Sequence, residues 1–102
     1  MADPQTAPVV ARLTSLIEEL GADVTTAEEA ASITFSRGRG FARLETATPT
    51  RVDVALVLPD AEETERLRPA DGFGTHRVSL AHEDEIDGEL TEWLRAAYAA
   101  AT

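Results

Sequence analysis

The sequence predicts an α+β domain in which one helix precedes, and another follows, a four-stranded antiparallel sheet. Apolar residues recur at helical spacing near both ends of the chain, and they alternate with polar residues in between. Helices that are segregated from strands in this way are typical of α+β architecture. With 102 residues the chain is large enough for one core and too small for two. Residues 1–102 are therefore predicted to form a single domain, of which residues 1–6 are an N-terminal tail.

The first helix is predicted from one apolar face, with start signals at Thr6 and Pro8 and a stop at Gly21. That face holds Val9, Leu13, Leu16, Ile17 and Leu20. Residues 23–30 are rich in Thr, Ala and Glu, and they allow either a short helical turn or an irregular connection.

Strict alternation then predicts three successive strands, with glycines at 37–40 and a proline at 47–50 marking the turns between them. Residues 75–80 give a fourth strand, after a polar connection at 59–74 that allows a helical turn at 62–67. The last helix is predicted from an apolar stripe behind an acidic start at 83–87, where the helix dipole favours negative charge. The stripe consists of Ile86, Leu90, Trp93, Leu94, Ala97 and Tyr98.

Two amphipathic helices can cover only one face of such a sheet, so we expect both on the same face and the other face open. The covered face is predicted to carry Ile33, Phe35, Ala42, Leu44, Val52, Val54, Leu56, Val78 and Leu80. The open face is predicted to carry Ser32, Thr34, Ser36, Phe41, Arg43, Glu45, Arg51, Asp53, Thr75, Arg77 and Ser79.

Positive charge is gathered on one segment of a very acidic chain. Residues 31–58 hold four arginines against two acids, whereas the rest holds five arginines against seventeen acids, and the chain has no lysine. Arginine is suited to bidentate or stacked contacts with anions. A net charge of −10 disfavours duplex nucleic acid and anionic membrane, so an anionic partner would have to be met by this segment.

Two interpretations of the open face follow. In the simpler one, which we favour, its arginines and acids form cross-strand ion pairs on a solvated surface. In the other, the face is a binding platform for an anionic or aromatic ligand such as a nucleotide or single-stranded nucleic acid. The candidate ligand-binding residues are Arg37, Arg39, Phe41, Arg43, Arg51, His76 and Arg77. The Arg-Gly-Arg-Gly stretch at 37–40 is too short for a phosphate loop and favours a plain turn.

Residue types that carry chemistry are sparse. There is no cysteine, and His76 and His82 lack a third ligand at zinc-site spacing, so we expect neither a metal nor a cofactor. His82 is predicted at the helix start with Glu85 three residues on, and His76 on the inward side of its strand. No positioned nucleophile is present, which argues against an enzyme. No stretch reaches the ~18 apolar residues of a membrane span, and a soluble cytoplasmic protein is expected.

The later part of the chain resembles a family of small domains of unknown function. The resemblance covers residues 31–100 and rests on short segments at 41–43, 51–56, 58–59, 66–67, 75–78 and 93–98. The resemblance implies a bacterial family found mostly in actinobacteria, alone or as a C-terminal module, and the chain also resembles YdhG-like α+β domains more distantly. The resemblance implies the helix, sheet, helix order and transfers no site residue.

The sequence therefore predicts a binding or interaction module whose partner is a small anionic ligand or another protein. An alternative is a structural domain that pairs through its sheet with itself or with a partner domain. The sequence is therefore compatible with either a monomer or a homodimer. A small enzyme with His76 as general base ranks last.

Overall fold

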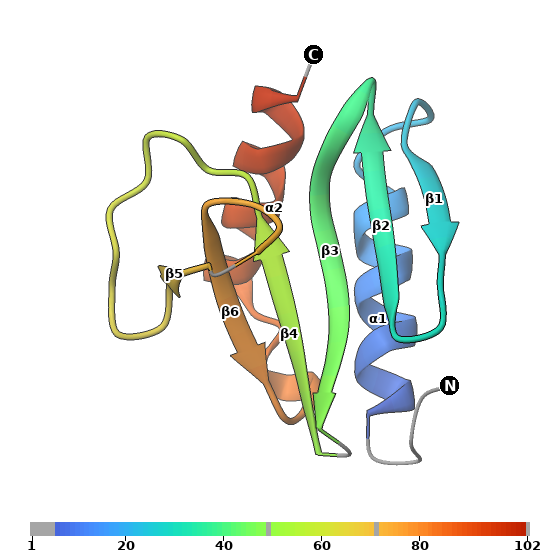
Figure 1. Ribbon diagram of the computed structural model, residues 1–102, viewed down its shortest axis with the longest axis vertical. Helices are drawn as coiled ribbons and strands as arrows, with labels where there is room; N and C mark the ends of the chain where they lie inside the picture. The colour runs from blue at the N-terminus through green and yellow to red at the C-terminus, as the bar shows by residue number, and fades with distance from the viewer. Residues whose placement is uncertain (1–5, 49, 71, 102) are drawn as a thin grey trace.

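The computed structural model describes residues 6–48, 50–70 and 72–101, and it contains two helices and a six-stranded sheet. The elements follow the order α1 (Ala7–Glu18), β1 (Thr25–Glu28), β2 (Ser32–Arg37), β3 (Arg39–Thr48), β4 (Arg51–Leu56), β5 (Arg68–Pro69), β6 (His76–Leu80), a 3-10 turn (Glu83–Glu85) and α2 (Gly88–Ala100). Every strand pair is antiparallel, in the spatial order β1-β2-β3-β4-β6-β5 (Figure 1). The predicted α+β class is thus confirmed.

The predicted covered face of the sheet is confirmed by the strand register. Ile33 pairs with Leu44, Leu44 with Val54, and Val54 with Val78, so one row of apolar side chains crosses four strands. The core adds the buried faces of both helices, Val9, Leu13 and Ile17 from α1 and Leu90, Leu94 and Ala97 from α2. Burial of these side chains is the main favourable term in folding.

The sheet has six strands where four were predicted, and both extra strands lie at its edges. Residues 25–28, expected as a turn or an irregular connection, form β1, which pairs along all four residues with β2. Residues 68–69 form β5 against β6. Neither strand has an alternating apolar pattern, because edge strands in this sheet are exposed and bury almost nothing.

Two further local predictions are wrong. Residues 62–67 contain no helical turn, and α2 begins at Gly88 after a separate 3-10 turn. The physical reason for the late start is Asp87, whose carboxylate accepts a hydrogen bond from the Leu90 N–H at 3.1 Å and so caps α2 there. Residues 1–5 of the predicted tail at 1–6, and Pro49 of the second predicted turn, lie outside the described residues, whereas Thr6 is the N-cap residue of α1.

A β-bulge between β2 and β3 changes which side chains face the core. Phe35 pairs with Ala42 but Ser36 pairs with Gly40, which leaves Phe41 as the extra residue. The Phe41 side chain is 0% exposed, and its ring meets Tyr98 of α2 edge-on at 5.8 Å. The placement of Phe41 on the open face is therefore wrong, because alternation cannot reveal an inserted residue.

The connection at 70–75 returns over the outer face of the sheet, the face opposite the core. At Gly40, a Cβ atom would stand only 3.0 Å from the Phe73 ring, so Phe73 lies against this backbone. Gly74 has φ of +82°, and a Cβ atom there would stand 2.6 Å from the Leu56 carbonyl oxygen. A glycine is required at this close approach.

We predict that Gly74→Ala destabilises the protein by about 1–3 kcal/mol, because alanine meets both a left-handed backbone and a carbonyl oxygen. Urea unfolding at 25 °C measures the loss. The matched control is Gly72→Ala, where a Cβ atom would meet nothing within 4 Å. Equal stability of the two variants would contradict this account of the 70–75 connection.

Candidate functional site

The arginines of the β2–β3 hairpin do not join the outer face. Arg37 donates from Nε to Asp23 at 2.9 Å and from a terminal nitrogen to the Tyr98 carbonyl at 3.1 Å, and it lies over the Tyr98 ring at 4.3 Å. Arg39 is exposed and pairs with Arg37 in the register. Arg37 shares the inward parity of Ile33 and Phe35 in β2, and the bulge in β3 turns Arg39 to the same side as its register partner Arg37.

Arg43 lies on the outer face, but it is engaged within the molecule. Its guanidinium stacks on Phe73 at 4.6 Å, and its Nε donates to the Thr34 hydroxyl on the neighbouring strand at 3.0 Å. Glu45 lies 4.0 Å away on the same strand. The aromatic ring of this face is therefore Phe73, supplied by a connection, and not Phe41.

The centre of the outer face is one carboxylate surrounded by donors. Asp53, only 6% exposed, accepts a hydrogen bond from Ser79 at 2.6 Å and lies 3.4 Å from Arg51 and 3.9 Å from Arg77. Neighbouring Ala55 is 4% exposed although it faces outward. The ion-pair interpretation therefore describes much of this face, but one carboxylate serves two arginines.

His76 lies on the covered side, as its parity predicts, and is 8% exposed. Its Nδ1 lies 2.8 Å from the Thr75 hydroxyl, which also accepts a hydrogen bond from the Leu58 N–H at 2.8 Å. This hydroxyl holds the 70–75 connection against the end of β4. His76 is thus buried away from the arginines with which it was grouped.

The sequence analysis missed the most open cationic part of the outer face. A surface hollow of about 410 Å³ lies between residues 65–68 and β6. It is lined by Glu65, Arg66, Arg68, Arg77 and Ser79. No local pattern revealed it, because residues 65–67 have no regular structure and Arg68 comes beside Arg77 only through the pairing of the two-residue strand β5 with β6.

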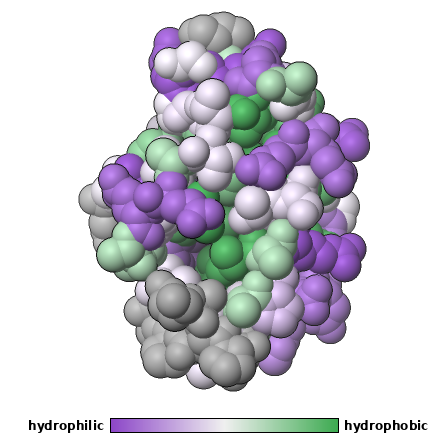
Figure 2. Space-filling view, turned by 90° about the vertical axis from the view of Figure 1, so that its right-hand side faces the viewer, coloured by the Kyte–Doolittle hydropathy of each residue, from purple (hydrophilic) through white to green (hydrophobic). Residues whose placement is uncertain are grey.

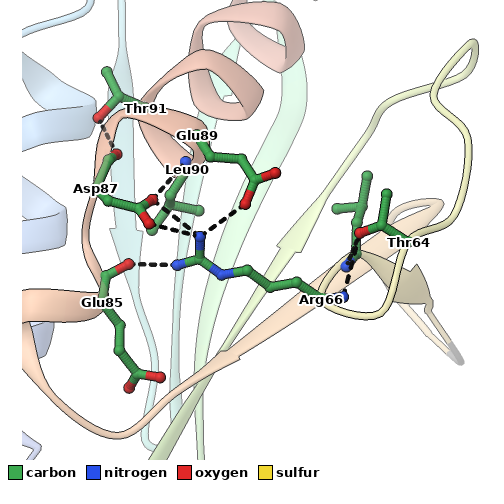
Figure 3. Close-up of polar contacts among 8 residues, drawn as sticks. Thr64, Arg66, Glu85, Asp87, Glu89, Leu90 and Thr91 are labelled. Atoms are coloured by element: carbon green, nitrogen blue, oxygen red, sulfur yellow. Dashed lines mark hydrogen bonds and ion pairs between the residues drawn. The ribbon is translucent and has the colours of Figure 1, made fainter.

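Arg66 fixes one wall of this hollow to the start of α2 (Figure 3). One terminal nitrogen donates to Asp87 at 2.9 and 3.0 Å and to Glu89 at 3.0 Å, and the other donates to the Glu85 carbonyl. On the other side, the Thr64 hydroxyl accepts from the backbone N–H groups of Arg66 and Leu67. This set of contacts, the Arg66 latch, orders a segment without regular structure.

The latch also sets the ionisation of its acids. The Leu90 N–H, followed by Arg66, holds the pKa of Asp87 below its ordinary value of 3.8. The backbone N–H groups of Ala81 and His82 hold the pKa of Glu85 below 4.5, which confirms the predicted pairing of His82 with Glu85. Burial opposes the charge of Arg66, but the hydrogen bonds to Asp87 and Glu89 outweigh it and raise its pKa.

A family comparison agrees with the predicted resemblance and extends it. Residues 2–101 match the model of a family described as "Domain of unknown function (DUF5655)", and the chain belongs to this family. No curated protein and no solved structure matches the chain. Among the described residues, no helix could cross a membrane, and no group of three histidines or acids is placed to hold a metal ion.

We predict that acid weakens the fold through the latch carboxylates. A carboxylate whose folded pKa is depressed stabilises the protein above its unfolded pKa, and this contribution is lost as the pH falls through the folded value. Because the pKa values of Asp87 and Glu85 are lowered, the melting temperature is expected to fall below about pH 4.5.

Asp87→Asn tests the assignment, since asparagine still caps α2 but cannot titrate. We expect a lower melting temperature than that of the wild type at pH 7 and a difference that shrinks as the pH falls below 3.8 through the lowered pKa of Asp87, followed by circular dichroism. Glu62→Gln, at an exposed carboxylate, is the matched control and should follow the wild-type curve. Parallel curves for Asp87→Asn and the wild type would contradict the prediction.

Proposed function

We propose that this domain is a binding module whose outer sheet face takes an anionic ligand. The observation that carries the proposal is a charge excess: the strands direct Arg43, Arg51, Arg68 and Arg77 to this face against only Glu45 and Asp53. With Glu65, which lines the hollow beside Arg68 and Arg77, the described residues of this face have a local net charge of +1 on a chain of net charge −10, and this excess attracts anions to the face.

The arrangement of the layers supports the proposal. Both helices share one core cluster with the alternate residues of β2, β3, β4 and β6, and Figure 1 shows the strands in front of the helices. We take both helices to cover the same face, which leaves the arginine-bearing face uncovered by a helix. An aromatic ligand is less well supported than an anionic one, because Phe41 is buried and Phe73 is already stacked on Arg43.

The acidic connection at 60–65 borders this face only at the hollow, where Glu65 lies in the lining, and it does not cover the centre of the face. Residues 60–65 are mostly exposed, and in the described part of the chain none of their acids forms an ion pair with Arg43, Arg51 or Arg77. Figure 1 shows the connection before β5 projecting beyond the sheet edge. The arginines at the centre of the face keep half-exposed side chains, 50% for Arg51 and 43% for Arg77.

We predict that pyrophosphate, nucleoside diphosphates or short single-stranded RNA shift the amide and arginine Nε–H resonances of this face saturably, at low and at physiological salt. The double variant Arg51→Gln/Arg77→Gln should weaken binding by about tenfold or more, or ~1.4 kcal/mol. The matched control Arg12→Gln/Arg95→Gln removes the same charge from the exposed surfaces of the helices and should weaken binding less than about threefold.

Because Asp53 is buried next to both arginines, the melting temperature of the double variant is measured first, and Arg77→Gln alone serves as the milder variant. Equal losses in the outer-face and control variants, or no saturable shifts on the outer face with any anion, would overturn the proposal.

A specific observation favours pairing through the sheet as a second candidate function. β1 is an edge strand whose four residues are all exposed, and a groove of about 360 Å³ with Val10, Ile33 and Leu44 in its lining lies beside it. Figure 2 looks onto this side and shows apolar surface between hydrophilic groups. An exposed edge strand offers unpaired backbone groups to a second chain.

If β1 pairs with β1 of a second copy, light scattering after size exclusion should give a mass that rises from monomer to dimer with concentration. Because the Glu29 N–H bonds to Ser32 of β2, the ladder alternation directs the Thr26 N–H to the free edge, so Thr26→Pro removes one backbone donor from this edge and should hold the protein as a monomer. A monomeric mass at every concentration would argue against self-pairing and leave the anion-binding proposal intact.

A further inference from the structure

The two outermost strands place two arginines directly opposite each other. Arg68 of β5 and Arg77 of β6 are register partners, so their side chains leave the same face with Cβ atoms about 4.5–5.5 Å apart. Like charges in this position destabilise a sheet. A feature of this kind calls for a compensating negative charge.

The protein itself supplies little compensation. Arg77 reaches only the far oxygen of Asp53 at 3.9 Å, and that carboxylate is shared with Arg51 and the Ser79 hydroxyl. Arg68 donates to the Thr64 carbonyl at 3.4 Å, a long contact with an uncharged group. Among the described residues, Glu65 is the one acid in the lining of the hollow. In this part of the chain, three arginines, Arg51, Arg68 and Arg77, thus face two acids at this corner.

We infer that the hollow between residues 65–68 and β6 binds a tetrahedral dianion of the phosphate type, bridged by the guanidinium groups of Arg68 and Arg77. This rests on the proposed anion-binding function and names its ligand chemistry. Guanidinium forks match the spacing of phosphate oxygens and bind them with paired hydrogen bonds. A dianion neutralises both arginines at once, which a single carboxylate cannot do.

The hollow is held in shape before any ligand arrives. The Arg66 latch ties one wall to α2, and Leu67, 1% exposed, anchors the chain into the core between the two arginines. The guanidinium of Arg66 is occupied by Asp87 and Glu89, so it positions the wall and is not itself the anion ligand. Fixed backbone at Arg68 lowers the ordering cost of binding.

The test is a titration of the full chain, observed through backbone amides and arginine Nε–H groups, with phenyl phosphate and with benzenesulfonate. The two probes share a ring and a tetrahedral head, but only the phosphate carries two charges near pH 7.5. We expect saturable shifts at Arg68, Arg77 and Ser79, and binding of phenyl phosphate about tenfold tighter than that of benzenesulfonate.

Arg68→Gln should abolish these shifts, and it should keep or raise the melting temperature in phosphate-free buffer, because a like-charge neighbour is removed. The wild type should gain melting temperature with phenyl phosphate, and the variant should not. The matched control is Arg95→Gln, at an exposed position of α2, and this variant should bind phenyl phosphate as the wild type does.

A further titration with inorganic phosphate distinguishes a free phosphate ligand from the phosphoryl group of a larger molecule. Equal affinities for inorganic phosphate and phenyl phosphate indicate a free phosphate, whereas tighter binding of the ester, with added shifts at Arg51, indicates the phosphoryl end of a larger ligand. Shifts confined to Arg43 and Arg51, or wild-type binding by Arg68→Gln, overturn this inference while the proposed function stands. No saturable outer-face shifts with any anion overturn both.

Discussion

The bulge that buries Phe41 governs the rest of the structure. One extra residue in β3 carries this ring into the core against Tyr98 of α2 and reverses the sides of the neighbouring positions toward the hairpin. Arg37, which has the inward parity of Phe35 in β2, meets Tyr98 and Asp23 on the same side, and the hydroxyl of Tyr98 donates to Asp23 at 2.6 Å. That hydrogen bond, followed by Arg37, lowers the pKa of Asp23. The hairpin, the start of β1 and the end of α2 are tied together at one point.

The outer face follows from the same event. Because the bulge turns Gly40 outward, Phe73 can lie on bare backbone, and Arg43 stacks on the ring. This end of the face is closed by contacts within the molecule. The open charge lies farther along β4 and β6, where Arg51, Asp53 and Arg77 meet. The candidate site is therefore displaced toward the β5 edge, and its ligand chemistry is set by arginines without an accessible aromatic ring.

The Arg66 latch gives the β5 edge its order. A two-residue strand contributes few backbone hydrogen bonds, and the segment before it has no regular structure. Carboxylates at the start of α2 are favourably placed for the helix dipole and for Arg66 together, so the acidic start of the helix serves two purposes. Like-charged Arg68 and Arg77 remain opposite each other on this anchored edge, which is the arrangement that a bound anion would stabilise.

The sequence alone determined the α+β class, both amphipathic helices and the row of apolar residues from Ile33 to Val78, because periodic burial is written directly into residue order. It also determined that positive charge is concentrated on the strands. Only the tertiary structure decided where that charge points. The bulge at Phe41 breaks the alternation, and exposed β1 and β5 have no apolar period to reveal them. The pairing of Arg68 with Arg77 depends on contacts between strands that no local pattern encodes.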